Sequence, residues 1–142
     1  MSGYTWAEGA AAVAAHAERD WEGLWSLLFA AGKAAYRLSL VAPPDVGAVL
    51  AFAAMDVCEA RDEVAWAHPD VPRTAIAVDL GLIGPVVDLP AACGVLVGLL
   101  DAALDRLALV KEAGLDVDGQ RLVRQVSSRV RGARGTISAV AR

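Results

Sequence analysis

The sequence predicts an all-α protein, an antiparallel bundle of four long helices and one short helix, folded as a single domain over residues 1–142. Alanine, the best helix former, supplies 30 of the 142 residues. Apolar residues recur at the spacing of one helix face in most segments. Most of the 13 glycines and 6 prolines lie between these periodic segments. A chain of this length can bury a sizeable core without disulfides or metal ions.

The first helix is predicted to begin at Thr5, because Thr5 as N-cap and Glu8 three residues later form a capping box. An Ala-rich run follows to about Glu18. Asp20 either caps a second helix or lies within one continuous helix. From Trp21 the pattern is strongly apolar, and its polar residues fall on one narrow stripe: Glu22, Ser26, Lys33 and Arg37. A helix with so thin a polar stripe is central in its domain or is covered by a partner.

Pro43-Pro44 ends this apolar helix, and Asp45 is predicted to cap the next one, which runs to about Ala67. The expected core face of that helix is Val46, Val49, Leu50, Ala53, Val57 and Val64. A loop containing prolines then leads to a shorter helix over residues 73–82, closed by Gly84-Pro85. The apolar character of this short segment also permits a strand.

Asp88 is predicted to cap the best-defined helix, and Gly114 to end it at the C′ position. Its apolar residues alternate spacings of four and three, as in helices packed at shallow angles: Leu89, Cys93, Leu96, Leu100, Ala103, Leu107 and Val110. A short turn separates it from the last helix, whose apolar face is Leu122, Val126, Val130, Ala133, Ile137 and Val140. Another face of that helix carries Arg121, Arg124, Arg131 and Arg134.

Composition narrows the class of protein. No stretch offers about 20 uninterrupted apolar residues, so no membrane span is expected. The N-terminus has no basic region before an apolar core, which argues against a secretory signal and for a cytoplasmic protein. Cys58 and Cys93 lie among apolar neighbours in helical patterns and are expected to be buried free thiols. We expect no cofactor and no metal ion.

Charge is divided unevenly along the chain. Residues 1–120 hold seven Lys or Arg against all 17 Asp and Glu, a net charge of −10. Residues 121–142 hold six Arg and no acid, a net charge of +6. The simplest explanation is that the arginines meet acids of the same fold or of a second copy. Plain solvation, nucleic-acid binding and contact with an anionic membrane are alternatives, and the acidic remainder of the chain disfavours nucleic acid.

The helix before Ala67 combines acids and large apolar groups on one arc opposite its core face. The acids of this arc are Asp56, Glu59, Asp62 and Glu63, and its large apolar residues are Phe52, Met55 and Trp66. Aromatic anchors beside charges are typical of a protein contact surface. Carboxylates aligned along a helix can also share a cation, but no Glu-x-x-His pair is present to complete a helical metal site. A merely solvated acidic face is the simplest alternative.

Four aromatic residues on the apolar helix admit three interpretations. Trp21, Trp25, Phe29 and Tyr36 can be ordinary core, can line an interface between two copies, or can line a pocket for an apolar molecule. No residue is assigned a catalytic role, and His16 and His68 fit surface or helix-end positions.

The leading hypothesis is therefore a non-enzymatic, self-associating bundle that works through protein contacts. Its contact surfaces would be the acidic-aromatic face and the basic last helix. The first alternative is a small helical enzyme or carrier for an apolar metabolite, with Asp56 or Glu59 as general base. The second alternative is a nucleic-acid-binding regulator that uses the arginines of the last helix.

Overall fold

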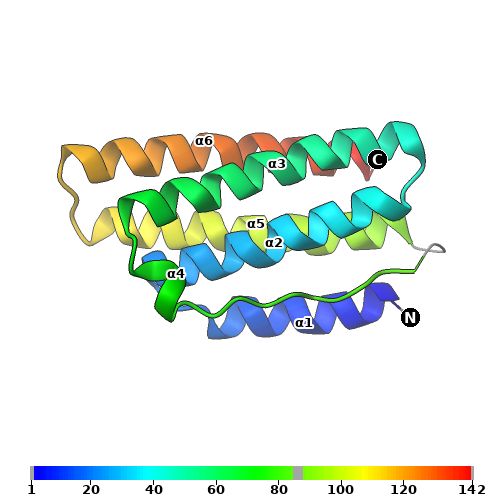
Figure 1. Cartoon of the computed structure of the whole chain (residues 1–142), viewed down its shortest axis with the longest axis horizontal. Coiled ribbons are helices and arrows are strands. Elements are labelled where there is room, and N and C mark those ends of the chain that lie inside the picture. The colour runs from blue at the N-terminus through cyan, green and yellow to red at the C-terminus, as the bar shows by residue number, and fades with distance from the viewer. Residues whose placement is uncertain (1, 85–87, 142) are drawn as a thin grey trace.

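A computed structural model describes residues 2–84 and 88–141 and confirms the all-α helical bundle (Figure 1). Its helices are α1 (Ser2–His16), α2 (Trp21–Val41), α3 (Pro44–Ala67), α4 (Val71–Thr74), α5 (Leu89–Glu112) and α6 (Val117–Val140). These described residues contain no strand. None of the helices in the described ranges has both the length and the apolar character needed to cross a membrane.

Four helices of 21 to 24 residues form the body of the bundle. Helix α2 packs on α3, α3 on α6, α6 on α5, and α5 on α2, and each neighbour runs in the opposite direction (Figure 1). Helix α1 packs outside this group, against α5 and α2. The interior is filled mainly by fully buried leucines, among them Leu24, Leu27, Leu28, Leu38, Leu50, Leu96, Leu99, Leu100 and Leu107.

Local signals set several helix ends as predicted. The Asp20 carboxylate accepts a hydrogen bond from the backbone N–H of Gly23 at 3.1 Å, so Asp20 caps α2 and the chain does not continue as one helix from α1. The Asp88 carboxylate likewise accepts from the N–H of Ala91 at 3.1 Å. Gly114 has φ of +91° just after the end of α5, the left-handed position that glycine occupies without strain.

The start of α1 differs from the prediction. The helix begins at Ser2 and ends at His16, so Thr5 lies within it instead of at its N-cap. A capping interaction contributes only about 1 kcal/mol, which tertiary packing readily outweighs. Trp6 provides such packing, because its side chain is completely buried and its indole N–H donates to the carbonyl of Gly81 at 3.2 Å.

The start of α3 differs by one residue. Pro43 is the N-cap and Pro44 the first helical residue, so Asp45 lies in the first turn and does not cap the helix. Proline suits this position because its φ is already helical and it has no N–H to satisfy. On the predicted core face of α3, Val49 is the exception, since it lies among the exposed residues.

The short helix predicted over residues 73–82 is wrong in extent. Helix α4 ends at Thr74, and residues 75–84 have no regular structure but run along α1 and α2 toward the start of α5 (Figure 1). At 1.5 Å per residue the bundle helices are about 32–36 Å long, and ten residues span about 33 Å only when extended. The chain must therefore be extended here to cross from one end of the bundle to the other. Of the predicted Gly84-Pro85 stop, Pro85 lies outside the described residues.

Residues 75–84 are fixed to the bundle at several points. Leu80 and Ile83 are buried, and the Arg37 Nε–H of α2 donates to the Asp79 carboxylate at 3.0 Å. The same carboxylate accepts from the N–H of Gly81 at 2.8 Å. The hydrogen bond from Arg37, and then the one from Gly81, lower the pKa of Asp79 below its ordinary value.

The lowered pKa predicts a pH-dependent attachment of this segment. The pKa of Asp79 is lower in the folded protein than in the unfolded chain. The contribution of the Asp79 carboxylate to stability is therefore complete above about pH 4 and is lost as the pH falls through the lowered pKa. The decrease in the free energy of unfolding between pH 6 and pH 3 should be smaller in Asp79→Asn than in the wild type, measured by urea denaturation. Asp105→Asn, at an exposed carboxylate of α5 with no ion pair in the described structure, is the control. Equal pH dependence in all three proteins would contradict the assignment.

Candidate functional site

An exposed apolar surface lies on α2 and α3. Its large side chains are between 40% and 69% exposed: Tyr36 and Leu40 on α2, and Val49, Phe52 and Met55 on α3. We refer to these five residues as the α2–α3 apolar surface. Single exposed apolar residues are ordinary, but a contiguous group of them commonly marks a contact site.

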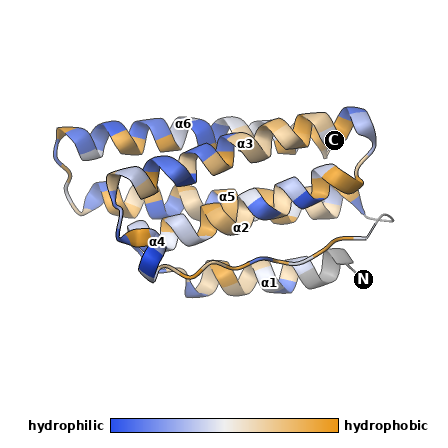
Figure 2. Cartoon of the chain, viewed as in Figure 1, coloured by the Kyte–Doolittle hydropathy of each residue, from blue (hydrophilic) through white to orange (hydrophobic). Residues whose placement is uncertain are grey.

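Close packing fixes the register of the two helices. A Cβ added to Gly32 would lie 2.9 Å from the Cys58 sulfur, and one added to Gly47 would lie 2.5 Å from the Ser39 carbonyl oxygen. These close approaches align the antiparallel helices, so the turn around Tyr36 is level with the exposed turn of α3 at Phe52. Figure 2 shows the corresponding change along α3, from orange near the turn with α2 to blue toward α4.

Three of the four predicted acids of α3 lie against one arginine that the sequence pattern did not single out, and the fourth, Asp62, pairs with Arg61 of the same helix. Arg129 of α6 donates from Nε to Glu63 at 2.8 Å and from Nη1 to Glu59 at 2.5 Å, and its Nη1 lies 3.9 Å from Asp56. The hydrogen bond with Glu63 is the main cause that raises the pKa of Arg129. One available signal is position, because Arg129 follows Val126 by three residues and so borders the apolar face of α6.

The predicted arginine face is divided by the fold. Arg134 donates to Asp101 of α5 at 2.5 Å, and this hydrogen bond raises the pKa of Arg134. Arg121, Arg124 and Arg131 are exposed and form no ion pair with any part of the chain that the structure describes. Two of the basic residues of α6 therefore meet acids of the same fold, and three remain available to solvent or a partner.

The four aromatic residues of α2 do not surround one cavity. Trp25 is buried and stacks on Phe29 with ring centroids 5.3 Å apart. Tyr36 lies on the α2–α3 apolar surface. Trp21 lies at the other end of α2 and stacks on the His68 imidazole at 4.7 Å. The sequence placed these residues on one helix, but the neighbouring helices give each a different environment.

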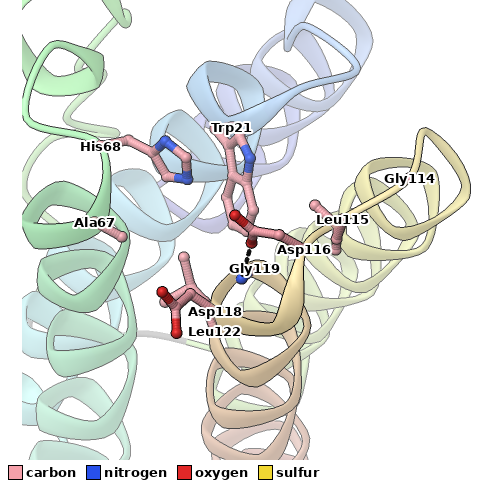
Figure 3. A pocket seen from close by; sticks show the side chains of 9 residues that line it. All are labelled: Trp21, Ala67, His68, Gly114, Leu115, Asp116, Asp118, Gly119 and Leu122. Carbon is pink, nitrogen blue, oxygen red and sulfur yellow. Dashed lines mark hydrogen bonds between the residues drawn. The ribbon is translucent and has the colours of Figure 1, made fainter.

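Trp21 and His68 line a hollow of about 360 Å³ at the end of the bundle, between the end of α3 and the α5–α6 turn (Figure 3). The Asp116 carboxylate accepts from the N–H of Gly119 at 2.7 Å and thereby caps α6. Asp118 supplies a second carboxylate. The other lining residues are Ala67, Gly114, Leu115 and Leu122. The titratable groups of this lining are the His68 imidazole and the two carboxylates, and it includes no hydroxyl, thiol or amine side chain.

The remaining candidate groups for chemistry are the thiols and the carboxylates. Cys58 and Cys93 are free, and burial raises the pKa of both thiols, which keeps them protonated and weakly nucleophilic at neutral pH. Cys93 is buried, as expected, and Cys58 is partly exposed. Within residues 2–84 and 88–141, no group of three or more His, Cys, Asp or Glu side chains is arranged to hold a metal ion.

Compared with family models, with curated proteins and with solved structures, the chain matches none.

Proposed function

We propose that the protein works by binding and not by catalysis, and that it self-associates through the α2–α3 apolar surface. The observation that carries the proposal is the exposure of five large apolar side chains on two helices that pack on each other, α2 and α3. Burying apolar surface is the main driving force of protein association. Aromatic and methionine side chains are also the types enriched at the centres of interfaces.

The size of the surface suits a second copy of the chain. Covering the exposed parts of its five side chains would bury roughly 430–710 Å² per copy if a fully exposed large side chain offers about 150–250 Å². A standard interface buries about 800 Å² per partner, so a rim of smaller neighbours completes the required area. A two-fold arrangement places the same surface on both partners.

Charges at the two ends of the surface favour the same arrangement. Lys33 is exposed on α2 toward the middle of the bundle, and Asp45 is exposed on α3 near the turn between the two helices. Neither forms an ion pair with another described residue. An antiparallel pairing centred on Phe52 brings Lys33 of each copy toward Asp45 of the other. The rim is then self-complementary, which sets orientation more than affinity.

The internal ion pairs predict how the association responds to salt. Arg129 is already paired with acids of α3, so the acidic face of α3 has less charge to offer a second copy. An apolar interface is strengthened or unchanged by salt, whereas an interface of exposed charges is screened by it. We therefore expect an oligomer that persists from low to high salt.

Light scattering coupled to size exclusion, at low and high salt, tests the proposal. Phe52→Ser should raise the dimer dissociation constant at least tenfold, because central aromatic residues commonly contribute most to an interface. Trp66→Ser is the matched control, since Trp66 is another aromatic residue of α3, is 76% exposed and lies outside the surface. A wild type that is monomeric at high micromolar concentration, or equal weakening by both variants, would contradict the proposal.

A further inference from the structure

A second pocket, larger than the hollow at Trp21, lies between the second half of α1, the start of α2 and residues 74–78 (Figure 1 shows these elements). Its volume is about 520 Å³, within the range of about 300–1,000 Å³ that is usual for small-molecule sites. Most of its wall is apolar, formed mainly by Ala12, Val13, Ala17, Ala75, Ile76 and Val78. Such a wall suits the hydrocarbon part of a ligand.

One hydroxyl of the lining has no hydrogen-bond partner within the described structure. Ser26 of α2 is only 7% exposed, and its hydroxyl makes no hydrogen bond with any residue that the structure describes. Its oxygen is not among the buried side-chain atoms that lack a partner, and Ser26 lines the pocket, so the hydroxyl is accessible to a bound molecule. The Ser26 hydroxyl can both donate and accept.

Two carboxylates belong to the lining, and its other titratable side chain is that of His16. The carboxylates are those of Glu18 and Glu22, neither forms an ion pair, and the lining contains no Lys or Arg. Glu22 Oε1 accepts from the Thr74 hydroxyl at 2.6 Å, which holds the carboxylate in place and leaves its other oxygen for a ligand. Ser26 follows Glu22 by one helical turn, so the two groups lie on the same face of α2.

We propose that this pocket binds a small amphiphilic amine. The ammonium group donates hydrogen bonds to the Glu22 carboxylate and to the Ser26 hydroxyl oxygen, which accept at neighbouring positions. The apolar body lies against Val13, Ile76 and Val78. An ammonium carries three donors and no acceptor, so it satisfies both groups at once. A carboxylate-bearing ligand of the same shape is repelled by Glu18 and Glu22.

Binding of three probes of similar size to the full chain, measured by calorimetry and NMR titration, tests this inference. The probes are 2-phenylethylamine, the neutral 2-phenylethanol and the anionic 3-phenylpropionate. We expect the amine to bind at least tenfold more tightly than the alcohol, and the anion not to bind. The amide shifts should be centred on Val13, Ser26 and Ile76. No binding of the amine at millimolar concentration would overturn the proposal.

Substitutions test separately whether ligand binding depends on the charge of the pocket or on its shape. Glu22→Gln retains an acceptor for Thr74 and should weaken amine binding about tenfold while leaving alcohol binding unchanged. Glu112→Gln, at an exposed carboxylate near the end of α5, is its control and should change neither. Ala12→Leu, at an exposed position of α1, should fill the pocket and block both probes. Amine binding that is unchanged in Glu22→Gln or in Ala12→Leu would place the ligand elsewhere and overturn the assignment.

Discussion

Replacing Gly23 by Ala is expected to lower the free energy of unfolding by about 3 kcal/mol or more, the upper range for overpacking a tight site. A Cβ at this position would lie 1.7 Å from the Glu18 carbonyl oxygen and 2.5 Å from its carbonyl carbon. Both atoms belong to the backbone, so no side-chain rotation relieves the clash. The turn between α1 and α2 must move instead.

That turn is held by α5. The Arg106 guanidinium donates to the carbonyl oxygens of Ala14 at 2.7 Å, of Ala17 at 3.1 Å and of Glu18 at 3.3 Å. Moving Glu18 away from a new Cβ breaks the hydrogen bond to its carbonyl and leaves part of the guanidinium without an acceptor. The expected loss of stability therefore has two parts, the steric clash itself and the hydrogen bonds that break when the turn moves to relieve it.

Urea denaturation followed by circular dichroism measures this loss, and Gly132→Ala is the matched control. Gly132 lies within α6, where an added Cβ meets no atom within 4 Å. Alanine in a helix interior is about 0.5–1 kcal/mol more favourable than glycine, so this variant should be slightly more stable than the wild type. Equal stability of Gly23→Ala and Gly132→Ala would show that the α1–α2 turn is free to move.

The long helices could be predicted because their signals are local. Asp88 and Gly114 bracket α5, and the residues of its seam are buried apart from the first, Leu89, which is partly buried. Residues 75–84 could not be predicted in the same way. Their extended course is set by the distance between the end of α3 and the start of α5, and that distance exists only once the bundle has formed.

The candidate surface was predictable in part for the same reason. Phe52 and Met55 lie opposite the core face of α3, so the helical pattern alone indicates their exposure. Tyr36 was grouped with Trp21 and Trp25 because all three belong to one strongly apolar helix. Which side of α2 is left uncovered depends on where α3 and residues 75–84 pack, and the pattern of α2 does not contain that information.

The pocket beside Ser26 could not be predicted from the sequence, for a different reason. Its walls come from α1, from the start of α2 and from the segment that was expected to be a short helix. A sequence pattern can place Glu22 and Ser26 on one face of a helix, as part of a narrow polar stripe. It cannot show that an extended segment lies beside these two residues and forms a pocket with them.

Replacing Arg129 by Ala is expected to cost about 2 kcal/mol of stability. Removing one partner of a buried ion pair costs about 3–5 kcal/mol, and the smaller figure here reflects the partial exposure of Arg129. Glu63 is the main cause of the loss, because its side chain is only 16% exposed and its Oε2 has no hydrogen-bond partner in the described structure. Without Arg129, three carboxylates on one face of α3 also repel each other.

A matched pair and a double variant distinguish this ion pair from a general effect of charge. Arg131→Ala removes an exposed arginine of the same helix that has no ion pair in the described structure, and should change stability by no more than about 0.5 kcal/mol. In a Glu63→Gln background, Arg129→Ala should cost about half as much as in the wild type, because no buried charge is left unpaired. Equal losses of stability in Arg129→Ala and Arg131→Ala would contradict this assignment. They would mean that the total positive charge of α6 matters for stability and that the contact between Arg129 and Glu63 does not. The acidic face of α3 would then be free to recruit a partner through charge, and association should weaken with salt.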